Sequence, residues 1–594
     1  MSKISHFISS IIRGGRFVIS YLKSTFSCFQ NKFPSFSQWS NLPRVFSKKE
    51  EIIFVSALIL IFLSSSYLAV FNYLNNTKLV PKEKGEYIEG IVGQPRYINP
   101  VLAQTNDVDR NLCRLVYSSL FKYDTNGNLI PDLVDRYNIS EDGLTYDIFL
   151  KKDVKWHDNK PLTSDDVIYT IKIIQDPNYK SPLFSNLQGV KIEKKGLWEI
   201  ELKLKSAYAP FLHNLTFGIL PSHLWNGISA SNFPLAEYNL KPIGSGPYKF
   251  EKFERNTQGE IKSINFIANK DYYFKKPYIQ RIIFKFYPDL QSAINDLNSG
   301  KIDGLEKIYP SEISELSKNI NIYRINLPRY YAIFFNQTKS KVISDKSARE
   351  ALRYAVDKKE IISKVLRNEG EIVNSPLLAD WIEVSNISYP FDINKAKEIL
   401  RKNGWEDEDN DGVLEKKIEK ETIDFEIELT TVDQKELKEV AEILKNQWEE
   451  LGIKVNLNIV GDDNIINEFI RPREYQALLF GEILSPEIDP FSFWHSSQKR
   501  DPGLNLSCYS NERVDNLLEE ARQSLDREER VKKYDEFQKI IIEDVPAIFL
   551  YTPNYLYPVN KKVKGIELKK LPLPCWRFSN IQNWYVKTKR VWKK

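Results

Sequence analysis

The longest apolar stretch of the chain lies close to its N-terminus. Residues 52–77 contain no charged side chain, and the segment from Ile52 to Phe71 is almost entirely apolar. A helix of about 20 apolar residues is long enough to cross the hydrocarbon core of a bilayer. The pattern therefore predicts one transmembrane helix over residues 51–74.

Beyond this run the apolar residues follow the shorter periods of a globular protein. Tyr146, Ile148 and Leu150 alternate with polar neighbours, as in a half-buried strand. Thr163 and Asp166 have the spacing of a capping box, which predicts a helix over residues 165–175.

Two further apolar stripes predict helices. A helix capped by Ser347 is expected to run through Ala351 and Leu352 to Leu366. A second stripe, from Leu437 to Leu451, stops at Gly452, and the alternating residues 453–459 follow directly. Helix, glycine stop and strand together indicate an α/β fold.

Charge is distributed unevenly around the apolar run. Residues 1–49 carry eight basic residues and no acidic one, whereas the net charge of the whole chain is only +5. The positive-inside rule places residues 1–50 in the cytoplasm and the large C-terminal part outside the cell membrane. The run is longer than a signal-peptide core and begins about 50 residues in, so an uncleaved signal anchor is expected over a cleaved signal peptide.

The length of 594 residues predicts three or four domains. The large part after residue 50 is close to neutral and offers no concentrated basic stripe, which argues against nucleic acid as a partner. Cys113, Cys508 and Cys575 would lie outside the cell, and an odd number permits at most one internal disulfide.

Residues 407–415 place acids at positions 1, 3, 5 and 9 of a loop with calcium-site spacing, and Gly412 at position 6. Position 12 is Ile418, so the bidentate acid of such a site is missing. A solvated turn is the preferred interpretation, and a calcium site is the alternative.

Two other motifs resemble catalytic or phosphate-binding groups. His157 and Asp158 are adjacent in an extended segment and point to opposite faces, which favours a structural role. Gly244-Ser245-Gly246 lacks the Lys-Ser/Thr of a phosphate-binding loop and precedes a proline, so it predicts a tight turn before a strand.

The segment from Tyr146 to Tyr169 resembles the signature of the family 5 bacterial extracellular solute-binding proteins: a strand, a charged turn, Trp156-His-Asp158, and a Pro161-Leu-Thr helix start. Asn159 stands where the family usually has Gly. Further blocks are similar to the family's at residues 93–100, 243–250, 349–362 and 546–551, so the resemblance runs from about residue 87 to the C-terminus.

The resemblance implies a type II periplasmic-binding-protein-like α/β fold, with two lobes, three subdomains and a hinge, after one transmembrane helix. The expected divisions are as follows: 1–50 cytoplasmic segment, 51–74 signal anchor, 75–86 linker, 87–125, 241–328 and 547–594 lobe I, 126–240 subdomain II, and 329–546 lobe III. Lobe I would hold both Cys113 and Cys575, the pair expected if a disulfide forms.

The resemblance also implies a function. We expect a monomeric, non-enzymatic protein without a cofactor or metal, which binds oligopeptides outside the cell and delivers them to the permease of an ABC transporter by closing its hinge. An acidic residue of the segment 478–497 would pair with the peptide's α-ammonium, and Glu482 and Asp489 are the candidates. The other expected ligand contacts are these: Phe480, Trp494, Gln104, Asn106 and Tyr551.

Three alternatives stay open at this point. The same fold could bind a sugar or another solute, or could act as a peptide-sensing receptor without transport. An extracellular hydrolase is disfavoured, because neither Gly-x-Ser-x-Gly nor His-Glu-x-x-His occurs in the chain.

Overall fold

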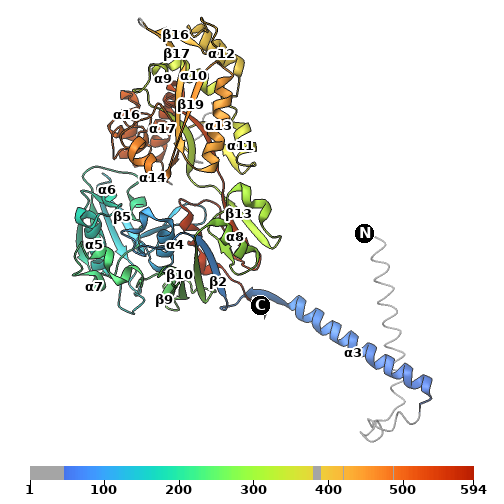
Figure 1. Ribbon diagram of the computed structural model, residues 1–594. Coiled ribbons are helices and arrows are strands. Elements are labelled where there is room, and N and C mark those ends of the chain that lie inside the picture. The colour runs from blue at the N-terminus through green and yellow to red at the C-terminus, as the bar shows by residue number, and fades with distance from the viewer. Residues whose placement is uncertain (1–45, 379–388, 419–420, 486, 594) are drawn as a thin grey trace, which may run out of the picture. The chain divides into compact units, whose positions relative to one another are not determined.

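The computed structural model describes residues 46–378, 389–418, 421–485 and 487–593 (Figure 1). The chain divides into two compact units. The smaller comprises residues 1–80 with 589–594, and the larger comprises residues 81–588. Most of the expected cytoplasmic segment, residues 1–45, lies outside the described residues.

The predicted transmembrane segment forms the helix α3 (Lys48–Asn76). Ser47 and Glu50 form a capping box at its start, and none of its residues is buried. Within the described residues, α3 alone is long and apolar enough to span a membrane. The expected linker after it contains the strand β1 (Thr77–Pro81), which pairs with the C-terminal strand β23 (Thr588–Trp592).

The larger unit is built on two mixed sheets, each with its own hydrophobic core. The seven-stranded sheet contains β2 (Glu86–Val92), β9 (Tyr248–Arg255), β10 (Ile261–Ala268), β11 (Arg281–Tyr287), β12 (Gly304–Leu305), β13 (Ile320–Ile325) and β22 (Tyr555–Asn560). The six-stranded sheet contains β14 (Arg329–Phe335), β15 (Gly370–Ile372), β18 (Glu426–Val432), β19 (Lys454–Val460), β20 (Ala477–Ile483) and β21 (Ala547–Pro553).

We call residues 86–325 with 555–588 the first lobe, and residues 329–553 the second lobe. The chain passes between them twice, at residues 326–328 and at Asn554. The return was expected after residue 546, but β21 is hydrogen-bonded to β14 in the second lobe, and only β22 joins the first.

The first lobe also carries a four-stranded sheet of β5 (Val134–Ile139), β6 (Thr145–Leu150), β8 (Glu199–Lys203) and β7 (Lys191–Gly196). β6 is the predicted strand, and Tyr146, Ile148 and Leu150 are buried as its alternation requires. The helix α5 (Ser164–Gln175) follows with the predicted capping box. The family's signature therefore contributes one strand, β6, to this sheet and begins the helix α5, which packs against β7 and β8.

The second lobe confirms one predicted helix and corrects another. α13 (Lys435–Glu449) ends before Gly452, whose φ is +79°, and β19 follows, parallel to β18. The helix expected to reach Leu366 is instead split into α10 (Lys346–Tyr354) and α11 (Lys358–Lys364). Asp345, and not Ser347, caps the first, and Asp357 interrupts the stripe because its carboxylate caps the second.

The glycine turn at residues 244–246 is hydrogen-bonded to the signature histidine, His157. A Cβ at Gly244 would lie 1.9 Å from the carbonyl oxygen of Val116, so only glycine fits there. His157 Nδ1 accepts a hydrogen bond from the Gly244 amide at 3.2 Å, and Nε2 lies 3.1 Å from the Gly246 carbonyl oxygen. Burial lowers the pKa of His157 to about 4. The histidine is thus a neutral structural residue, as its position in the sequence predicts.

Candidate solute-binding cleft

Residues of both lobes line a cavity of about 670 Å³ beside the two crossings. Asn126, Asn128 and Lys570 come from the first lobe, Asn326 from a crossing, and Glu371 from the second lobe. The lining also includes Leu377, Leu378, Glu487, Arg527, Arg530, His213, Thr552 and the residues 570–572. The walls of this cavity therefore carry amides, a hydroxyl, charges of both signs and a few apolar side chains.

At this cavity an ion pair of the second lobe lies beside a histidine of the first lobe. Arg530 Nη2 of α17 (Arg527–Asp544) lies 2.7 Å from Glu487 Oε1, and His213 Nε2 of the first lobe lies 3.7 Å from Glu487 Oε2. Burial, with the nearby Arg530 cation, lowers the pKa of His213 to about 4. His213 is therefore neutral at pH 7, so that one ring nitrogen donates and the other accepts. Its Nδ1 is already hydrogen-bonded to the Tyr123 hydroxyl at 2.8 Å, which leaves Nε2 facing Glu487.

A second cavity, of about 510 Å³, also has walls from both lobes. On it, the Tyr208 hydroxyl donates to Asp489 Oδ2 at 2.9 Å, and Arg522 Nη2 lies 3.1 Å from the same oxygen. Arg522 belongs to α16 (Glu512–Gln523) and stacks on the rings of Tyr208 and Phe491, at 4.9 and 4.1 Å. The Ala209 amide completes the contact by donating to the Arg522 carbonyl at 2.8 Å. We call Tyr208, Asp489 and Arg522 the latch.

The expected cleft loop of the first lobe lies at the start of α4 (Asp107–Val116). Gln104 lines a third cavity, of about 100 Å³, together with Arg110, His213 and Asn214. Asn106 is the N-cap of α4: its Oδ1 accepts from the Val108 amide at 2.8 Å, and its Nδ2 donates to the Gln94 carbonyl. Its amide is therefore occupied in holding the helix.

A buried charge network fixes α4 to the sheet. Arg577 and Glu89 are both completely buried, and Arg577 Nη2 lies 2.8 Å from Glu89 Oε1. Arg577 also donates to Asn111 of α4 at 2.6 Å, and Asn111 donates to Glu306 at 2.7 Å. Because the Arg577 cation and the Glu89 carboxylate are paired directly, and Asn111 links them to Glu306, these groups can stay buried at moderate cost.

Four other predicted site residues belong to the second lobe. Glu482, Trp494 and Tyr551 are 4%, 1% and 1% exposed, and the last two are part of its hydrophobic core. Phe480 is partly buried against the same core. Glu482 accepts a hydrogen bond from the Tyr330 hydroxyl, and burial raises its pKa to about 8. In this arrangement the side chain of Glu482 is buried and hydrogen-bonded inside the lobe, and it lines none of the cavities described above.

Of the predicted residues, the structure thus brings Asp489 and Gln104 to cavities and places Glu482, Trp494 and Tyr551 inside the second lobe. Glu487, His213, Arg530, Tyr208 and Arg522 were not predicted. Glu487 lies in the segment 478–497 and could have been considered beside Asp489. The others come from segments with no recognisable motif, and only the meeting of the lobes reveals them.

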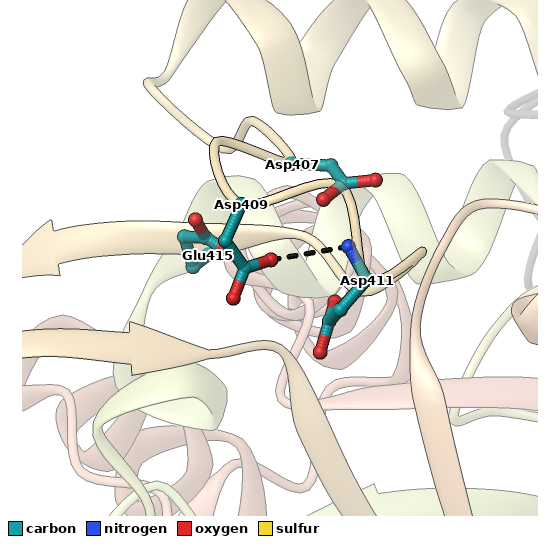
Figure 2. Close-up of side chains that lie close together, drawn as sticks. All are labelled: Asp407, Asp409, Asp411 and Glu415. Atoms are coloured by element: carbon teal, nitrogen blue, oxygen red, sulfur yellow. Dashed lines mark hydrogen bonds between the residues drawn. The ribbon is translucent and has the colours of Figure 1, made fainter.

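The acidic loop after α12 (Ile393–Lys402) gathers Asp407, Asp409, Asp411 and Glu415, with one carboxylate oxygen of each within 4.8 Å of the others (Figure 2). These carboxylates accept amide hydrogens of their own loop. Asp411 Oδ1 accepts from Val413 at 2.8 Å, and Asp409 Oδ1 accepts from Asp411 at 3.1 Å, the bond drawn in Figure 2. Such bonds are those of a tight, solvated turn.

The cysteines do not form the expected pair. Cys113, Cys508 and Cys575 are free thiols, and Cys113 and Cys575 are both buried in the first lobe. The two line the same small cavity. Burial raises the pKa of Cys113 well above its ordinary value, so this thiol stays protonated.

Comparison with known proteins gives consistent matches. The model of the bacterial extracellular solute-binding proteins, family 5 (middle), matches residues 128–503. The oligopeptide-binding protein AppA of Bacillus subtilis is 32% identical over 519 residues, which cover 85% of this chain and 92% of AppA. The structure of that AppA with a nonapeptide superimposes with a TM-score of 0.68, at 30% identity, over 86% of this chain and 100% of AppA.

A second solved structure is that of NikZ from Campylobacter jejuni in complex with Ni(L-His). It has a TM-score of 0.70 and 30% identity, and covers 85% of this chain and 100% of NikZ. These relatives are solute-binding proteins, and the fold they share is the type II periplasmic-binding-protein fold. The chain therefore belongs to the family 5 bacterial extracellular solute-binding proteins.

Proposed function

We propose that this protein is held in the cell membrane by α3, captures oligopeptides between its lobes, and delivers them to the permease of an ABC transporter. The observation that carries the peptide assignment is the polar cavity with charges of both signs between the lobes. A peptide offers the matching chemistry: a backbone rich in hydrogen-bonding groups, an ammonium and a carboxylate. The nonapeptide bound to AppA of Bacillus subtilis supports this choice.

The lining of the cavity supplies each of the required partners. Asn126, Asn128 and Asn326 can exchange hydrogen bonds with peptide groups, which need partners once they leave water. Glu371 offers a carboxylate to an ammonium, and Arg527 offers a cation to a carboxylate. A hydrated cavity of this kind tolerates different side chains, because water fills what they leave.

Asp489 and Gln104 remain the predicted residues that we propose as ligand contacts, because each borders a cavity. We assign Glu482, Phe480, Trp494 and Tyr551 a supporting role in the second lobe, and Asn106 the role of holding α4. Asp489 has a second role as well, since it already bridges the lobes through Tyr208 and Arg522.

Closure of the lobes couples binding to delivery. The two crossings allow one lobe to rotate on the other, and the latch contacts join the lobes and would break if the lobes moved apart. A ligand that contacts both lobes shifts the population toward this arrangement. No reaction is needed, and we propose that the protein acts as a monomer without a cofactor.

The anchor is proposed on the length and exposure of α3, which begins at Lys48 after a basic segment. With the N-terminus in the cytoplasm, the solute-binding unit lies outside the membrane. In this arrangement the captured peptide stays near the permease.

The test is native mass spectrometry of the full chain released from membranes in mild detergent. A ladder of masses that fit short peptides supports the proposal. A single mass of a sugar, or of a nickel complex like that bound by NikZ, would overturn the peptide assignment and leave the fold untouched. A chain released by alkaline washing without detergent would overturn the anchor.

A further inference from the structure

A basic and aromatic surface surrounds the C-terminal end of α3. Residues 72–82 and 587–594 contain no acidic residue. The seven basic residues of these two stretches are Lys78, Lys82, Lys587, Lys589, Arg590, Lys593 and Lys594. We call Lys78, Lys589, Arg590 and Lys593, with Tyr73, Leu79 and Trp592, the juxtamembrane surface.

The fold brings these two distant stretches of sequence together. β23 pairs with β1 directly after the helix, and the Lys593 amide donates to the Asn76 carbonyl at 2.7 Å. Arg590 Nη1 donates to the Thr77 hydroxyl oxygen at 3.0 Å. The strand β23 therefore lies at the end of the helix (Figure 1).

Large apolar side chains of this surface are open to solvent. Tyr73, Leu79 and Trp592 are 44%, 60% and 63% exposed, and the rings of Tyr73 and Trp592 meet edge to face at 6.0 Å. Tyrosine and tryptophan gather at the boundary of membranes, where one end of the ring is apolar and the other meets water.

The depth of the surface fits this boundary. The apolar run from Ile52 to Phe71 has the length of the hydrocarbon core. Asn76 lies five residues beyond Phe71, which in a helix is about 7.5 Å at 1.5 Å per residue. The headgroup region of each leaflet is about 5–7 Å deep. β1 thus begins, and β23 ends, at the outer edge of the headgroup region.

We infer that the juxtamembrane surface binds the anionic headgroups of the leaflet that faces the solute-binding unit. The inference rests on the membrane anchor proposed above and adds a second contact to it, made by the C-terminus. Basic side chains with no acid among them suit phosphate groups, and the exposed aromatic rings enter the boundary beside them. The surface follows directly on the proposed transmembrane helix α3. The membrane is therefore the partner that always lies beside it.

The experiment uses the full chain in nanodiscs of phosphatidylglycerol or of phosphatidylcholine, with amide hydrogen exchange followed over residues 77–81 and 588–592. We expect exchange at least about 5-fold slower in phosphatidylglycerol, because each contact must break before these amides open. About 1 M salt should remove the difference, since charge attraction is then screened.

The variant K78Q/K589Q/K593Q removes three exposed cations, leaves the Arg590 contact in place, and should lose the difference between lipids. The control K270Q/K276Q/K532Q removes the same number of positive charges from the larger unit. This control should keep the difference in exchange between the two lipids. Equal exchange in both lipids, or equal loss in both variants, overturns the inference while the anchor stands. Failure of the chain to stay in the nanodiscs overturns the anchor and the inference with it.

Discussion

At the residue scale, Glu482 shows how burial decides the chemistry of a side chain. Its sequence neighbourhood suggests an anchoring acid, but the structure gives it the Tyr330 hydroxyl and the interior of a lobe. One carboxyl oxygen, Oε1, is buried without a hydrogen-bond partner. Periodicity could predict that this residue lies on a strand. It could not predict that the strand is covered on both sides.

The pH dependence of stability tests this placement of Glu482. Its pKa is raised to about 8, so between its ordinary value near 4.5 and 8 the folded chain holds a proton that the unfolded chain has released. Stability from this group is full below pH 4.5 and falls as pH rises to 8, by up to about 1.4 kcal/mol per pH unit. We expect the change in urea midpoint between pH 5 and pH 8 to shrink in E482Q.

The exposed Glu237 supplies the control for that measurement, and E237Q should follow the unchanged chain at every pH. If E482Q has the same pH dependence as the unchanged chain, Glu482 is ionised in the folded protein, and its role as the anchoring acid becomes open again.

At the scale of elements, the sequence indicates regular pieces and misses where they are interrupted. The alternation at residues 146–150 and the capping box of Thr163 predict β6 and α5 to within one residue. The stripe from Ala351 to Leu366 does not reveal the break between α10 and α11, because Asp357 can lie in a helix or cap one. The return at Asn554 was missed because β21 and β22 are equally apolar.

The buried pair of Arg577 and Glu89 is expected to be essential for the first lobe, because it joins β2, α4 and the C-terminal segment. R577Q leaves the Glu89 carboxylate buried without its cation, and loss of one partner of a buried pair costs about 3–5 kcal/mol. We expect a clear loss in the thermal midpoint, measured by circular dichroism.

Arg281 offers the matched control for Arg577. It forms ion pairs with Glu86 and Glu251 on the surface of the same sheet, and R281Q should cost less than about 1 kcal/mol. Equal losses for R577Q and R281Q would contradict the assigned importance of the buried network.

At the scale of the whole molecule, function depends on contacts between lobes, which no local pattern encodes. The sequence resemblance supplied the two-lobed plan, and the structure added the latch and the approach of His213 to Glu487. Tyr208 and Asp489 are far apart in the chain, so neither spacing nor periodicity could connect them. The sequence could predict that the segment 478–497 contributes to the candidate site. It could not predict which residues of this segment contact the other lobe.

Removal of the Tyr208 hydroxyl tests the latch. Y208F loses a hydrogen bond to a carboxylate that joins the lobes, and about 1–2 kcal/mol of closed-state stability corresponds to a roughly 5- to 30-fold weaker Kd. Calorimetric titration with a peptide identified by mass spectrometry measures the change.

Tyr169 provides a matched variant, because its hydroxyl donates to the Trp225 carbonyl at 2.8 Å within the first lobe. Y169F should leave the Kd within about twofold, although it loses a hydrogen bond of similar length. An unchanged Kd in Y208F would mean that the latch contributes nothing to the bound state.

The position of the two crossings has a genetic consequence. Ile325 and Tyr555 are paired neighbours in antiparallel strands, so the second lobe enters and leaves the first at adjacent points. In the chain the second lobe is therefore an insertion between two paired strands, and a short turn from residue 325 to residue 555 would close these strands into a hairpin. Exchange of the gene segment between these two points would replace one wall of the cleft and leave the other wall in place.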